Sequence, residues 1–97
     1  MANIRWSNQA VKDLEAIINY ISQDSEDYAK IFVKKIINII ETIPELPYSG
    51  REVPEYKNEL IREKFFKNYR IIYRIRDDVI EIIRIFHFSR LFNKNLD

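Results

Sequence analysis

The spacing of apolar residues changes once along this chain, and that change limits the folds it can adopt. Before residue 44 the apolar residues recur every three or four positions, which is typical of helices that bury one face. After residue 58 they alternate with polar residues or form dense β-branched runs, which is typical of strands. The sequence therefore predicts a helical half followed by a sheet-forming half.

Two helices are expected in the first half, over about residues 8–23 and 26–43. Ser7 can cap the first helix and Asp24 or Ser25 the second, because a short polar side chain can accept a free amide hydrogen of the first turn. Prolines follow the second helix and end it. Two helices joined by a few polar residues are expected to pack as an antiparallel hairpin.

The second half predicts three strands after a loop. Residues 44–58 contain all three prolines and the only glycine, and we interpret them as the loop. The strand segments are ELIREKF (59–65), YRIIYRIR (69–76) and VIEIIRIFHF (79–88), and a short first strand is expected at Ile4–Trp6. The predicted order is β-α-α-β-β-β: one α+β domain over residues 1–97, with a helical hairpin packed on a small, mainly antiparallel sheet.

Composition narrows the classes of function. Cysteine is absent, which excludes disulfides, thiolate metal sites and thiol catalysis. One histidine and scattered carboxylates form no ligand cluster, so we expect no metal and no cofactor. No apolar run approaches the roughly 20 residues of a membrane span, and the N-terminus lacks the pattern of a signal peptide. We therefore expect a cytoplasmic protein with no membrane partner.

Charge is unevenly placed along the chain, although the net charge is only +1. Residues 58–76 carry six basic side chains against two acidic ones, Glu59 and Glu63. The basic side chains are Arg62, Lys64, Lys67, Arg70, Arg74 and Arg76. A local basic patch attracts anionic partners such as nucleic acid or an acidic peptide. A solvated strand face is the alternative interpretation.

Strand alternation predicts which of these charges share a face. Asp77-Asp78 can form a two-residue turn, and regular pairing beyond it would put Arg74 opposite Glu81 as an ion pair. The same register puts His87 on the face of Arg70.

In the preceding strand, pairing Phe66 with Arg70 sends Ile61 and Phe65 to the core. This pairing predicts a basic groove on one open face, formed by Arg62, Lys64, Arg70, Arg74 and His87.

The motifs along the chain resemble those of one known superfamily. The motifs are W-S-x-x-A-x-x-D-L-x-x-I-x-x-Y-I (6–21), GREVPE (50–55), LIRE (60–63), YRIIYRI (69–75) and HFSR (87–90). Their order and spacing resemble the RelE/ParE toxins of type II toxin–antitoxin systems. The resemblance implies a cognate antitoxin that wraps the toxin with an extended or helical segment.

The resemblance leaves the target open. RelE-like and YoeB-like members cut mRNA on the ribosome without a metal, whereas ParE-like members bind DNA gyrase and are not nucleases. A third possibility is a non-toxic member that only binds its antitoxin.

Metal-free RNA cleavage needs a base, a cation and an acid. Alignment with YoeB-like nucleases assigns these roles to Glu55, Arg70 and His87, with Arg62, Lys64 and Arg90 as RNA contacts. Phe88 stands where those nucleases have a tyrosine, and a histidine followed closely by an arginine also occurs in ParE-like members.

Overall fold

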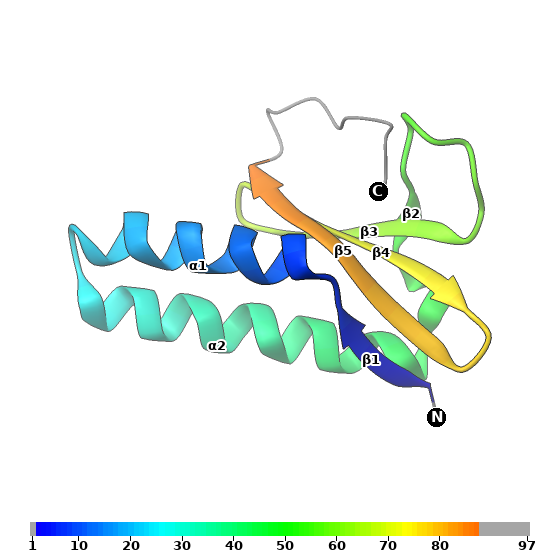
Figure 1. The fold of residues 1–97 in the computed structure, drawn as a ribbon, viewed down its shortest axis with the longest axis horizontal. Coiled ribbons are helices and arrows are strands. Elements are labelled where there is room, and N and C mark those ends of the chain that lie inside the picture. Colours follow the sequence, from blue (N-terminus) through cyan, green and yellow to red (C-terminus); the bar gives the residue numbers. More distant parts are fainter. Residues whose placement is uncertain (1, 88–97) are drawn as a thin grey trace.

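The computed structural model describes residues 2–87, which form a helical layer packed against one face of a five-stranded sheet (Figure 1). The elements in chain order are β1 (Asn3–Trp6), α1 (Asn8–Ser22), α2 (Glu26–Thr42), the short 3-10 helices η1 (Ile43–Glu45) and η2 (Pro47–Ser49), β2 (Arg51–Glu52), β3 (Ile61–Phe66), β4 (Tyr69–Arg76) and β5 (Val79–His87). The strand order is β1-β5-β4-β3-β2, with β1 parallel to β5 and the other pairs antiparallel. The predicted α+β architecture is confirmed, and β2 is an additional short strand within the predicted loop.

Both helices begin at the predicted serine caps. The Ser7 hydroxyl accepts the Ala10 N–H, and the Ser25 hydroxyl accepts the Tyr28 N–H, each at 3.0 Å. Ser7 also donates to the carbonyl of Ile83 at 2.9 Å, so this cap joins the start of α1 to β5. No helix among residues 2–87 is long and apolar enough to cross a membrane.

The main core lies between the helical hairpin and the sheet. Phe32 is at its centre, with edge-on ring contacts to Phe66 and Tyr69 at 5.2 and 5.3 Å between centroids. The fully buried Tyr73 fixes the loop beyond α2: its hydroxyl donates to the carbonyl of Pro47 at 2.6 Å and accepts the Gly50 N–H at 3.2 Å. The loop that follows the helices is therefore attached to the central part of the sheet.

A second, smaller apolar cluster covers the other face of the sheet. Its buried members are Val53, Ile61, Ile72, Ile83 and Phe86, and Tyr56 packs against them. The segment after β2 thus lies over the face that the sequence predicted to be open.

The turn between β4 and β5 has two residues as predicted, but the pairing changes beyond it. Arg74 lies opposite Glu81 and donates to its carboxylate at 2.6 Å, which confirms the predicted ion pair. Farther along, Tyr73 pairs with Ile82 while Ile72 pairs with Arg84, so Ile83 is the extra residue of a β-bulge.

One extra residue reverses the alternation of side chains, and His87 therefore opposes Tyr69 on the helix side. The prediction that Arg70 and His87 share a face is wrong.

The register between β3 and β4 also differs from the prediction by one residue. Lys67 adopts a left-handed conformation with φ of 51°, which allows a two-residue turn and pairs Phe66 with Tyr69. Arg62 and Lys64 then fall on the helix side, so the predicted basic groove does not form. The face away from the helices is instead occupied by Ile61, Glu63 and Phe65. The expectation that Ile61 and Phe65 join the main core is therefore also wrong.

Candidate functional site

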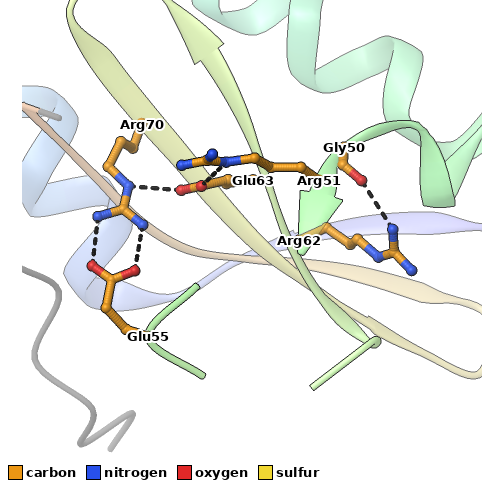
Figure 2. Close-up of polar contacts among 6 residues, drawn as sticks. All are labelled: Gly50, Arg51, Glu55, Arg62, Glu63 and Arg70. Carbon is orange, nitrogen blue, oxygen red and sulfur yellow. Dashed lines mark hydrogen bonds and ion pairs between the residues drawn. The ribbon is translucent and has the colours of Figure 1, made fainter. Parts of the chain in front are cut away.

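The centre of the candidate site is the guanidinium group of Arg70, on the face of β4 away from the helices. Its Nε donates to Glu63 Oε1 at 2.6 Å, and its Nη1 and Nη2 donate to the two carboxylate oxygens of Glu55, each at 2.9 Å (Figure 2). Glu63 is fully buried and also accepts from Nε of Arg51 at 2.6 Å. We call Arg51, Glu63, Arg70 and Glu55 the ion network.

The charges of the ion network cancel, since two carboxylates alternate with two guanidinium groups. Only 6% of the Arg70 side chain is exposed, and its guanidinium lies 5.5 Å above the ring of Phe86. Hydrogen bonding to Glu55 is the largest influence on the pKa of Arg70 and raises it above its ordinary value, against an opposing effect of burial. Arg70 is therefore a paired, buried cation in this structure.

Three strands and the segment after β2 build the ion network. β4 supplies Arg70 and β3 supplies Glu63, which lies diagonally across the pair because the connecting turn has two residues. Arg51 comes from β2, which pairs with β3, and Glu55 from the segment that follows β2. Glu55 and Arg70, both named as site residues from the sequence, are hydrogen-bonded to each other, whereas Glu63 and Arg51 were not predicted. A two-residue turn between β3 and β4 is the signal that would have placed Glu63 beside Arg70.

The remaining predicted site residues lie apart from the ion network. His87 is on the helix side of the sheet, where its ring meets Tyr69 edge-on at 5.6 Å. Arg62 donates to the carbonyls of Gly50 and Glu59 at 3.1 and 2.7 Å, so its guanidinium holds the loop ends. Arg90 lies outside the described residues.

An open pocket of about 340 Å³ lies beside the ion network, and Lys64 is among its lining residues although its side chain alternates to the helix side of β3. Arg51 and Phe65 also line it, and the Arg51 guanidinium lies 5.1 Å from the Phe65 ring centre. Across residues 2–87, no group of three or more histidine or carboxylate side chains is placed to hold a metal ion. The polar chemistry available on this face is therefore that of paired arginines and carboxylates.

Comparison with known proteins assigns the chain to a family. The family model described as "ParE toxin of type II toxin-antitoxin system, parDE" matches residues 4–92. The chain belongs to the RelE/ParE superfamily of type II toxins. A toxin of this class forms one half of a pair, and its partner is the cognate antitoxin.

Relatives of the toxin carry names from both branches of the superfamily. It is 32% identical to "Toxin RelE2" of Caulobacter vibrioides over 91 residues, which is 94% of this chain and 100% of that protein. The structure of the chromosomal ParDE toxin–antitoxin system from P. aeruginosa superposes with a TM-score of 0.74 at 21% identity, covering 90% of this chain and 96% of that one. The YoeB dimer from Staphylococcus aureus superposes with a TM-score of 0.62 at 21% identity, covering 86% and 92%. Both superpositions bear out the fold.

Proposed function

We propose that this toxin inhibits growth by binding a protein target, DNA gyrase, in the manner of ParE-like toxins, and that it does not cleave mRNA. The observation that carries the proposal is the state of Arg70. Two carboxylates already compensate its charge, and the side chain that would donate a proton, His87, lies on the other face of the sheet.

RNA cleavage without a metal requires the opposite arrangement. A cation must meet the scissile phosphate as negative charge develops, and an acid must reach the leaving oxygen within hydrogen-bond distance. To bind a phosphate through Nη1 and Nη2, Arg70 would first have to break its paired bonds to Glu55. A movement of the guanidinium that also broke its bond to Glu63 would leave this buried carboxylate with only Arg51 as partner, which is strongly unfavourable. The contacts of Glu55 and Arg70 therefore support a structural role for these residues better than the catalytic roles that the resemblance implies.

Inhibition by protein binding makes no such demand on the ion network. It needs a stable scaffold and an exposed surface that recognises the target. The match to the ParE family model, which spans 89 residues from 4 to 92, points to the same branch of the superfamily.

The proposal is tested by running two assays on the same purified toxin. We expect it to inhibit negative supercoiling of relaxed plasmid by gyrase, and we expect primer extension on ribosome-bound mRNA to reveal no new cleavage sites. Addition of the cognate antitoxin should restore supercoiling. Cleaved mRNA together with uninhibited supercoiling would replace the proposal with the nuclease interpretation.

A further inference from the structure

A second hollow lies on the helix side of the sheet, away from the ion network. It forms where α1 meets the ends of β4 and β5, and its volume is about 200 Å³. Its lining residues include Ile17, Tyr20, Tyr69 and His87, so aromatic and apolar residues make up most of its wall. We call this hollow the aromatic pocket. Its size and lining suit one large apolar side chain of a partner.

Tyr20 stands at the edge of the aromatic pocket with 70% of its surface exposed. Tyr28, at the start of α2, is also exposed, and both phenols lie near Tyr69. Burial, followed by the neighbouring phenols of Tyr20 and Tyr28, raises the pKa of Tyr69 above its ordinary value. Tyr20 from α1 and Tyr69 from β4 are thus the tyrosines that line the pocket. Exposed tyrosines beside a pocket are frequent anchors in protein interfaces.

The tip of the helical hairpin, which lies next to Tyr20 and Tyr28 in the sequence, is acidic. Every charged residue between Lys12 and Lys30 is acidic: Asp13, Glu15, Asp24, Glu26 and Asp27. Asp13, Ile17 and Tyr20 lie on one stripe of α1, and Asp24 follows in the turn between α1 and α2, at the tip of the hairpin. Asp13 is neutralised by Arg84, with Arg84 Nε at 2.8 Å from Asp13 Oδ2, whereas Asp24 at the tip is exposed. The hairpin tip therefore repels the phosphate backbone of RNA and attracts a basic segment.

We infer that the aromatic pocket is the docking surface for the toxin's protein target, and that it accepts an aromatic or branched side chain carried on a segment rich in lysine or arginine. This inference builds on the proposed function, because it assigns to one surface the protein binding that inhibition requires. The acidic tip beyond Tyr20 guides the basic segment, and the pocket buries the anchor. An acidic segment of the antitoxin is disfavoured at this surface by like charge.

Two pairs of matched substitutions test the inference. Tyr20→Ala removes the exposed ring, and Leu46→Ala is its control, since Leu46 is 68% exposed on the linker between the 3-10 helices. Asp24→Lys reverses a charge at the hairpin tip, and Glu45→Lys reverses an exposed charge on η1. Growth inhibition on induction is measured for each variant, together with the concentration that half-inhibits gyrase supercoiling and the midpoint of thermal unfolding.

We expect Tyr20→Ala to weaken inhibition by about tenfold or more, which corresponds to about 1.4 kcal/mol of binding free energy. Asp24→Lys should weaken inhibition most at low salt, and both controls should match the wild type. Because Tyr20 and Asp24 are exposed, all four variants should unfold near the wild-type midpoint. Equal potency of Tyr20→Ala and Leu46→Ala would overturn the inference. If the wild-type toxin leaves gyrase uninhibited, the proposed function is overturned instead. The growth inhibition by Tyr20→Ala, compared with that by Leu46→Ala, then still decides the role of the pocket.

Discussion

Replacing Arg70 with alanine is expected to lower the free energy of unfolding by about 3–5 kcal/mol, because it breaks a buried ion pair from one side. Glu63 would stay fully buried with only Arg51 as partner, and Glu55 would lose both of its hydrogen bonds to the guanidinium. The free energy of unfolding, measured by urea denaturation monitored by circular dichroism, checks this expectation.

The control is Arg74→Ala, which removes the partly exposed ion pair with Glu81 and should cost at most about 1 kcal/mol. Equal losses for the two variants would contradict a special role of the ion network. Loss of toxicity in Arg70→Ala alone would not identify a catalytic residue, since an unfolded toxin is also inactive.

The double variant Glu63→Leu/Arg70→Leu should recover part of the lost stability, because it removes the buried carboxylate together with its partner. We expect that variant to remain toxic, whereas a nuclease that depends on Arg70 would stay inactive.

Substituting Gly50 with alanine is expected to destabilise the toxin by about 1–3 kcal/mol or more, as overpacking in a close-packed interior does. The added Cβ would lie 2.6 Å from the Tyr73 hydroxyl oxygen and 2.7 Å from the carbonyl oxygen of Glu63. Neither neighbour moves easily, because Tyr73 is fully buried and the Glu63 carbonyl belongs to the backbone of β3. The shift of the thermal unfolding midpoint measures the effect.

A double-mutant cycle with Tyr73→Phe shows whether the contact itself causes that loss. Removing the hydroxyl relieves one of the two close contacts, so Gly50→Ala should cost less in the Tyr73→Phe background than in the wild type. If the stability losses of Gly50→Ala and Tyr73→Phe are additive, the loss in Gly50→Ala comes from the contact with the Glu63 carbonyl and not from the Tyr73 hydroxyl.

The architecture could be predicted because local signals agree with the tertiary fold. Ser7 and Ser25 cap the two helices, the apolar stripes face the sheet, and the turn after Arg76 has two residues. The pairing of Arg74 with Glu81 follows from that turn before any irregularity intervenes. Short-range periodicity is sufficient for this part of the fold.

The side of the sheet on which each candidate site residue lies could not be predicted, because it depends on two positions where the alternation of apolar and polar side chains is ambiguous. Ile82 and Ile83 are both apolar, and each is buried on a different side: Ile82 in the main core and Ile83 in the second cluster. The sequence therefore accommodates a bulge without exposing an isoleucine, and the bulge moves His87 to the helix side. In β3, Phe65 and Phe66 could each have faced inward, so the register was decided by the left-handed turn at Lys67. The catalytic and RNA-binding roles of the predicted site residues are still untested predictions.

The strand order has a consequence for the synthesis of the toxin. β5, the last of the strands within residues 2–87 to be synthesised, lies between β1 and β4 and is the only described neighbour of β1 in the sheet (Figure 1). Until residues 79–87 emerge, β1 has no partner and the face of α1 that packs on β5 is uncovered, so an incomplete chain cannot close its core. Such long-range pairing makes folding wait until β5 has been synthesised. A nascent chain that still lacks β5 therefore cannot present the folded toxin surface to a target or to the antitoxin.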